Sequence, residues 1–275
     1  MPEVVEQLPT ISWFIAVASL AALAWAIGVS VGRSNVAVSR TALVLSVAGL
    51  LAWGYLMRRQ EVAVQLIPAA VLSRVEGVAA VPLFMLVVGI AWTRAHLSRQ
   101  RHIIGWAMVV GAIYFVQGGW WMVQTTPAMG QSRSLGDGIV LQSQDYSCVA
   151  AASATALNML GIHATEAEMA ELTETRPGTG ATTLRAMAAL QRKLDGTGYR
   201  VDLISPDYAH LTRVELPALT PLQFDAARRH MVTLLNVGPQ GVTYADPMEG
   251  IAYLDRDQFT RVYRGQVLVL RAAGN

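Results

Sequence analysis

A long uncharged stretch near the start of the chain constrains its fold most. No charged residue lies between Glu6 and Arg33, and residues 11–31 are almost entirely apolar. At about 1.5 Å per residue, a helix over this stretch crosses a hydrocarbon core of about 30 Å. The chain begins with the acidic segment MPEVVEQ, whereas a cleaved signal peptide begins with basic residues. The sequence therefore predicts a membrane-spanning helix here.

Three further segments have the length and apolarity of membrane spans. They are residues 41–57, 77–93 and 103–123. Residues 1–123 are thus predicted to form a transmembrane region with about four spans. Residues 62–73 are also apolar, but this segment is short and contains Pro68. We expect it to lie on the membrane surface or to re-enter the bilayer.

The charges divide the chain into two parts. Residues 1–132 carry 8 Arg and 4 Glu, whereas residues 133–275 carry 13 basic and 15 acidic residues. Five of the eight arginines fall in loops on one side of the predicted spans, and three fall on the other. Because positively charged loops prefer the cytoplasm, we expect an integral protein of the bacterial inner membrane with its C-terminal part on the extracytoplasmic side.

The predicted spans contain no charged residue, and Gln117 is their one strongly polar side chain. Ion pathways and proton relays usually need charged groups within the membrane. The helices are therefore expected to anchor the C-terminal part. Presentation of a membrane-bound substrate is the alternative.

Several functional classes are excluded by composition. Lys193 is the single lysine and no basic cluster is interleaved with aromatic residues, so nucleic-acid binding is rejected. One cysteine excludes an internal disulfide and the metal sites that need paired Cys or Cys with His. No glycine-rich phosphate loop followed by Lys and Ser or Thr occurs, so the chain is expected to have no ATP-binding domain of its own. No metal or organic cofactor is implied.

The C-terminal part changes from helical to strand-like patterns along the chain. Residues 124–138 are rich in turn formers and are predicted to be a linker, followed by a domain over residues 139–275. Helices are expected after Cys148, over 166–172 and over 183–194. Strands are expected over 199–204, 218–224, 230–237, 241–245 and 266–270. This order predicts an α+β domain with N-terminal helices packed on a mostly antiparallel sheet.

Cys148, the single cysteine, opens an apolar helical pattern that stops at Gly161. The first turn of a helix has unsatisfied N–H groups and the positive end of the dipole, which favour the nucleophilic thiolate. A single cysteine is also often a small buried apolar residue. Its role therefore depends on partners elsewhere in the chain.

Candidate partners follow in the order Gln142, Cys148, His230, Asp246. His230 opens one predicted strand and Asp246 ends the next, so a tight turn between the strands brings them close. Asp246 would orient the imidazole while His230 exchanges protons with the thiol and the leaving amine. Gln142 would donate its side-chain amide to the oxyanion beside the Cys148 backbone N–H.

Each of these residues also has an ordinary structural reading. Cys148 would then be a buried thiol in a degenerate domain, and His230 a histidine at a strand edge. Asp246 precedes Pro247, and Asp is common in turns whatever the function. For the role of Gln142, Gln144 is the nearest competitor.

The combination resembles the bacteriocin-processing peptidases of the papain-like group, which remove leader peptides ending in a double glycine. The matching motifs are QSQDYSC with Gln142 and Cys148, HMVTLLNV with His230, and ADP with Asp246; the later segment GIAYLDRDQFTRVYRGQVLVL is also similar. The resemblance covers about residues 139–272. The residue after the cysteine is commonly Gly in the family and is Val149 here, and the family's exporters usually place this domain before their membrane region.

The resemblance implies a papain-like fold and a membrane-anchored cysteine endopeptidase with Cys148, His230, Asp246 and Gln142 as catalytic residues. It also implies cleavage of a peptide or leader peptide after small residues such as Gly-Gly, in partnership with a separate exporter. Two alternatives stay open. One is a catalytically silent domain that binds leader peptides for a partner transporter, and the other is a thioester acyl or peptidyl transferase.

Overall fold

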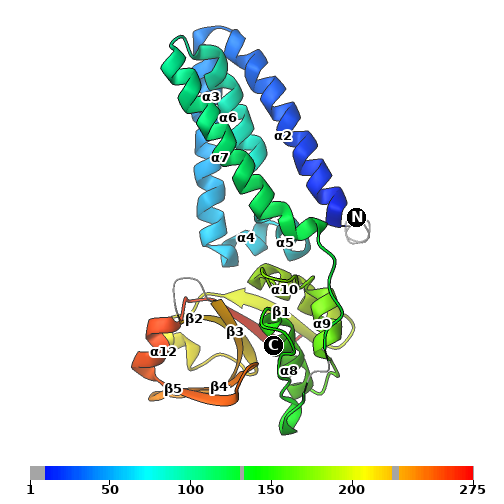
Figure 1. Ribbon diagram of the computed structural model, residues 1–275. Coiled ribbons are helices and arrows are strands. Elements are labelled where there is room, and N and C mark those ends of the chain that lie inside the picture. The colour runs from blue at the N-terminus through cyan, green and yellow to red at the C-terminus, as the bar shows by residue number, and fades with distance from the viewer. Residues whose placement is uncertain (1–9, 131–132, 225–228, 275) are drawn as a thin grey trace. The chain divides into compact units, whose positions relative to one another are not determined.

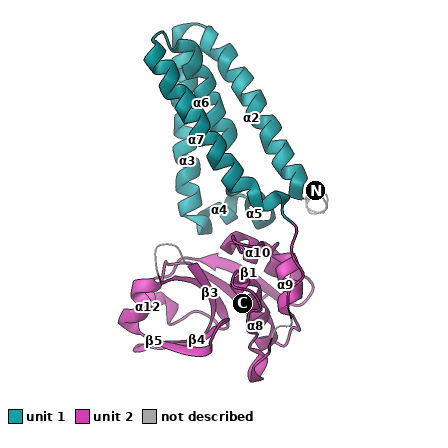
Figure 2. Ribbon diagram, viewed as in Figure 1, with its two compact units in different colours: residues 1–124 teal, residues 125–275 magenta. Residues whose placement is uncertain are grey.

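The computed structural model describes residues 10–130, 133–224 and 229–274. Its contacts divide the chain into two compact units, Met1–Gln124 and Thr125–Asn275 (Figure 2). The segment predicted as a linker, residues 124–138, belongs to the second unit except for Gln124. The Leu135 N–H donates to the Ile139 carbonyl at 2.9 Å, and the Leu141 N–H donates to the Arg133 carbonyl at 2.8 Å.

The first unit is helical (Figure 1). Its described helices are α2 (Thr10–Arg33), α3 (Val36–Arg58), α4 (Gln60–Leu66), α5 (Ala69–Val75), α6 (Ala80–Arg94) and α7 (Ser98–Val123). Three of them, α2, α3 and α7, are each long and apolar enough to cross a membrane by length and composition. Helices α5 and α6 pass the same test only together and are bent by 51°. These helices are compatible with a membrane anchor.

The bend lies where we expected a straight span over residues 77–93. Helix α6 begins only at Ala80, with Pro82 in its first turn, where a proline needs no intrahelical partner. A Cβ added to Gly77 would lie 2.9 Å from the Gly118 carbonyl oxygen, so the chain before α6 runs directly against the α7 backbone. The apolar segment 62–73 lies in α4 and α5, which separate at the extended Ile67 before Pro68.

Glycines let α2 and α6 pack closely. A Cβ added to Gly28 would lie 2.4 Å from the Leu86 carbonyl oxygen, and one added to Gly89 would lie 2.7 Å from the Trp25 carbonyl oxygen. The two backbones therefore touch with no room for a side chain, as is common for helix pairs in membranes.

The second unit contains a six-stranded sheet with the order β1-β6-β2-β3-β4-β5, and all of its neighbours are antiparallel. The strands are β1 (Tyr199–Ile204), β2 (Ala218–Gln223), β3 (Arg229–Val237), β4 (Gly241–Asp246), β5 (Gly250–Asp255) and β6 (Val267–Ala272). The helices are η1 (Gly136–Gly138), α8 (Cys148–Met159), α9 (Glu166–Leu172), α10 (Thr183–Leu194), α11 (Tyr208–Leu211) and α12 (Arg256–Val262). The predicted α+β class is confirmed. The prediction lacked β5 and the short helices η1, α11 and α12.

Strand β3 is covered on both faces, which explains its nearly continuous apolar run. Val232 and Leu234 belong to a buried cluster with Phe259 of α12. Thr233 lies between them and donates its hydroxyl to the Ala152 carbonyl of α8 at 2.9 Å, because alternate residues of a strand point to opposite faces. Figure 1 shows α8, α9 and α10 together at one side of the sheet, apart from α12, which contacts β4 and β5.

Candidate active site

Cys148 is the first residue of α8 and is partly exposed. Small residues follow it, and those from Ala150 to Ala156 are buried, so the helix fits closely into the domain. The helix ends before Gly161, whose φ of +77° favours glycine. Val149, which follows Cys148, is 4% exposed, so its side chain is packed inside the domain.

His230 and Asp246 meet at the ends of neighbouring strands. Extending the β3–β4 register by one residue places Asp246 opposite Val232, two residues from His230. The His230 Nε2 lies 2.9 Å from Asp246 Oδ1, and both side chains are buried. Since a carboxylate only accepts, Nε2 carries the proton. The other ring nitrogen, Nδ1, is left for the Cys148 side chain, which also interacts with His230.

The environment of His230 favours its charged form. Burial alone would lower its pKa, but hydrogen bonds to Asp246 and to Cys148, together with electrostatic interactions with the same two side chains, raise the pKa of His230 from 6.5 to about 9. At neutral pH the ring is therefore an imidazolium that can donate a proton from each nitrogen.

Asp246 is held as an anion. Burial would raise its pKa, but the hydrogen bond from His230 and the backbone N–H of Met248 lower it below its usual value. The Met248 N–H lies 2.7 Å from the same Oδ1 that accepts from His230. The Asp246 carboxylate therefore both stabilises the turn that contains Pro247 and binds His230.

Gln142 lies beside this pair. Its backbone N–H donates to the Pro247 carbonyl at 2.8 Å, which ties it to the residue after Asp246. Its side-chain Nε2 donates to the Gln144 carbonyl at 2.7 Å. An amide nitrogen carries two hydrogens, so one remains for another acceptor. Gln144, the competitor in the sequence, takes part here through its backbone carbonyl.

The structure also reveals a buried acid that we did not predict as part of the site. Glu166 is 0% exposed, and its Oε1 accepts from Ser143 and Ser147, which lie between Gln142 and Cys148. Nothing in the spacing marks it, because in the sequence it looks like an ordinary acid in the first turn of a helix.

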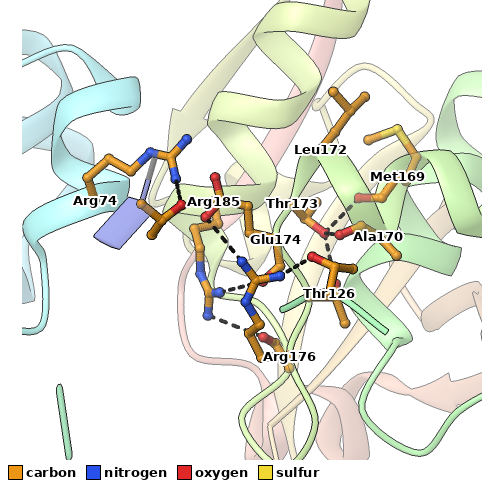
Figure 3. Close-up of polar contacts among 12 residues, drawn as sticks. Arg74, Thr126, Met169, Ala170, Leu172, Thr173, Glu174, Arg176 and Arg185 are labelled. Carbon is orange, nitrogen blue, oxygen red and sulfur yellow. Dashed lines mark hydrogen bonds and ion pairs between the residues drawn. The ribbon is translucent and has the colours of Figure 1, made fainter. Parts of the chain in front are cut away.

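A loop over residues 176–180 adjoins the residues before Cys148. Arg176 and Gly180 exchange backbone hydrogen bonds, and a Cβ added to Gly180 would lie 3.0 Å from the Tyr146 carbonyl oxygen. Arg185 donates to the carbonyls of Glu174 and Gly180, and Arg176 donates to Thr126 (Figure 3). Two buried arginines thus fix this loop next to the candidate nucleophile.

No cluster of three or more His, Cys, Asp or Glu that could hold a metal ion occurs among the described residues. The side chains that meet at the site are the Cys148 sulfur, the His230 imidazole held by Asp246, and the nearby Gln142 amide.

Comparisons with known proteins identify a family for the second part of the chain. Residues 137–275 match the family model described as Peptidase C39 family. An uncharacterized protein of Methanothermobacter thermautotrophicus is 35% identical over 142 residues, which cover 50% of this chain and 92% of that protein. Its counterpart in Methanothermobacter marburgensis is 34% identical over 137 residues, which cover 50% of this chain and 90% of that protein.

Two solved structures are also similar. One is a double glycine motif protease from an AMS/PCAT transporter in complex with the leader peptide; it has 16% identity, a TM-score of 0.42, and coverage of 54% of this chain and 96% of that chain. The other is the peptidase domain of Streptococcus ComA, with 17% identity, a TM-score of 0.44, and coverage of 50% of this chain and 98% of that chain.

Proposed function

This chain belongs to the Peptidase C39 family, which confirms the resemblance inferred from its motifs, and from that premise we propose that it is a membrane-anchored cysteine endopeptidase. The observation that carries the proposal is the connected set Cys148, His230 and Asp246, in which His230 contacts both other side chains. A cysteine thiolate beside an imidazolium that is itself held by a carboxylate is the arrangement that nucleophilic acyl chemistry needs.

In the proposed mechanism Cys148 and His230 form a thiolate–imidazolium pair, in which the thiol proton lies on His230 Nδ1. The thiolate attacks the peptide carbonyl, so that a C–S bond forms and the carbonyl oxygen becomes an oxyanion. The free N–H of the Gln142 amide and the backbone N–H of Cys148 stabilise that oxyanion. His230 donates its Nδ1 proton to the leaving amine as the C–N bond breaks. It then takes a proton from water as the water oxygen bonds to the thioester carbon, and the C–S bond breaks to release the acid and restore the thiolate–imidazolium pair. Asp246 keeps the ring oriented throughout.

For the substrate we propose a peptide or leader peptide cut after small residues such as Gly-Gly. This extends to the present chain the substrate of a similar protein, a double glycine motif protease whose structure holds the leader peptide. A separate exporter is the proposed partner, since similar domains come from transporters.

For the location we propose that α2, α3, α7 and the bent pair α5–α6 span the membrane. The arginine distribution of the loops supports an extracytoplasmic position for the second unit. The proposed role of the helices is to hold the peptidase at the bilayer, where an exported peptide emerges.

The test is cleavage of a synthetic peptide that contains an internal Gly-Gly by the full chain in detergent, with products identified by mass. Hydrolysis after the second glycine, absent in Cys148→Ala, supports the proposal. Products joined to an added amine would instead indicate a transferase. Binding without any cleavage would indicate a silent leader-binding domain and overturn the peptidase assignment.

A further inference from the structure

A buried carboxylate lies behind the loop that joins Gln142 to Cys148. Glu166, the first residue of α9, accepts three hydrogen bonds at one oxygen, Oε1. The donors are the Ser143 N–H at 2.8 Å, the Ser143 hydroxyl at 3.2 Å and the Ser147 hydroxyl at 2.6 Å. One oxygen therefore fixes the positions of two serines.

These serines lie at the two ends of a turn. Ser143 directly follows Gln142, and Ser147 directly precedes Cys148. The turn between them is closed by the Ser147 N–H, which donates to the Gln144 carbonyl at 3.3 Å. Because Glu166 binds both ends, it sets the separation between the amide of Gln142 and the start of α8.

The three hydrogen bonds that Glu166 accepts from Ser143 and Ser147, called the Glu166 clamp below, also affect the orientation of the Gln142 amide. The Ser147 hydroxyl has one hydrogen, and its 2.6 Å contact with Glu166 is shorter than its 2.9 Å contact with the Gln144 carbonyl. The Ser147 hydroxyl therefore donates its hydrogen bond to Glu166. The Gln144 carbonyl is left to accept from Gln142 Nε2 at 2.7 Å, so the orientation of that amide depends on a turn that Glu166 holds.

The second oxygen of Glu166 is not explained by packing. Oε2 is buried and has no hydrogen-bond partner among the described residues. A buried carboxylate oxygen without a partner is costly, and such a group in a native structure calls for an explanation. The explanation that we infer is positional: the three hydrogen bonds at Oε1 all fix the 142–148 loop, and this role keeps Glu166 buried.

We propose that Glu166 is a positioning residue of the peptidase, which holds Gln142 and Cys148 so that the free amide N–H and the Cys148 backbone N–H converge on the same oxyanion. The inference rests on the proposed function, because the oxyanion exists only if Cys148 attacks a carbonyl. Glu166 should therefore affect stabilisation of the oxyanion but leave the reactivity of the Cys148 sulfur unchanged.

The experiment separates these two effects on the full chain in detergent. The probe is acetyl-glycyl-glycinal, whose aldehyde carbon bonds to the Cys148 sulfur while His230 supplies the proton that neutralises the new oxygen. That oxygen takes the place of the oxyanion. Iodoacetamide alkylates the same sulfur by displacing iodide and forms no oxyanion, so it reports the nucleophile alone.

We expect Glu166→Leu to weaken aldehyde binding by about 10- to 100-fold, somewhat less than the loss of an oxyanion donor itself. The iodoacetamide rate should stay within about twofold. The loss in a double variant with Gln142→Ala should be smaller than the product of the two single losses, because Glu166 acts in part through Gln142. Glu166→Gln, which keeps an accepting oxygen, should restore binding. Glu171→Leu, on the exposed part of the same helix, is the matched control.

Unchanged aldehyde binding in Glu166→Leu, or losses that multiply in the double variant, would overturn the inference and leave the peptidase assignment intact. If Glu166→Leu does not fold, Ser147→Ala removes the shortest bond of the clamp and must give the same selective loss. A wild-type chain that binds no aldehyde would overturn both the proposed function and the role of Glu166.

Discussion

Replacing Asp246 by Asn tests what holds the proton on His230. The change keeps the size of the side chain but removes its charge, while burial of the ring still disfavours the imidazolium. A charge-assisted hydrogen bond contributes about 1.5–3 kcal/mol, and one pKa unit corresponds to about 1.36 kcal/mol. The pKa of His230, about 9 in the wild type, should therefore fall by about 1–2 units.

The assay is NMR of the full chain with carbon-13 at the histidine Cε1 positions. The chain has 5 histidines, and loss of one signal in His230→Gln identifies the right one. Its chemical shift against pH gives the pKa directly in the wild type and in Asp246→Asn. A wild-type pKa at or below the ordinary 6.5, or one that does not change in Asp246→Asn, would refute the reasoning.

Further predictions concern stability and glycine positions. Because the pKa of His230 is higher in the folded than in the unfolded chain, its protonation contributes stability that is fully present below pH 6.5 and is lost as pH rises through about 9. The free energy of unfolding, measured with denaturant, should therefore differ less between pH 6 and pH 9.5 in Asp246→Asn than in the wild type. Gly178→Ala should lower the free energy of unfolding by about 1–2 kcal/mol because of the positive φ at that position. Gly180→Ala should lower it further, because Gly180 also has positive φ and an added Cβ would meet the Tyr146 carbonyl within 4 Å. Equal unfolding midpoints in the two variants would contradict this. Gly28→Val should force α2 away from α6, destabilise the full chain by about 1–3 kcal/mol and so lower its thermal unfolding temperature. Gly54→Val, at a position where an added Cβ meets nothing within 4 Å, should leave that temperature unchanged. Similar unfolding temperatures in the two variants would contradict the packing argument.

The strand pattern was predictable where side chains report burial. The apolar run after His230, and the short runs between turn residues at β1 and β4, marked those strands within one or two residues of their bounds. Strand β5 was missed because it lies at the sheet edge and exposes Ile251 and Tyr253. An edge strand that faces solvent has little reason to show a buried pattern.

The membrane half shows the limit of counting apolar residues. Hydropathy identified the region of every long helix, but it did not give the 51° bend before α6. At the bend Gly77 lies against Gly118, a residue 41 positions away in the sequence. Such contacts carry no local signal.

In the site, residue order and spacing indicated which side chains to consider, and the strand register explains why His230 reaches Asp246. Glu166 had no such signal, because its partners are two serines that are common in turns. Its burial behind the 142–148 loop is visible only in three dimensions.

The most direct test of the central claim, a thiol activated by His230, is the alkylation rate of the single cysteine at pH 6. An unassisted thiol with a pKa of about 8.5 is less than about 1% ionised at that pH. We expect iodoacetamide to alkylate Cys148 in the wild-type chain at least about tenfold faster than in His230→Ala, because the imidazolium stabilises the thiolate. Equal rates in the two proteins, at the level of an unassisted thiol, would contradict the account.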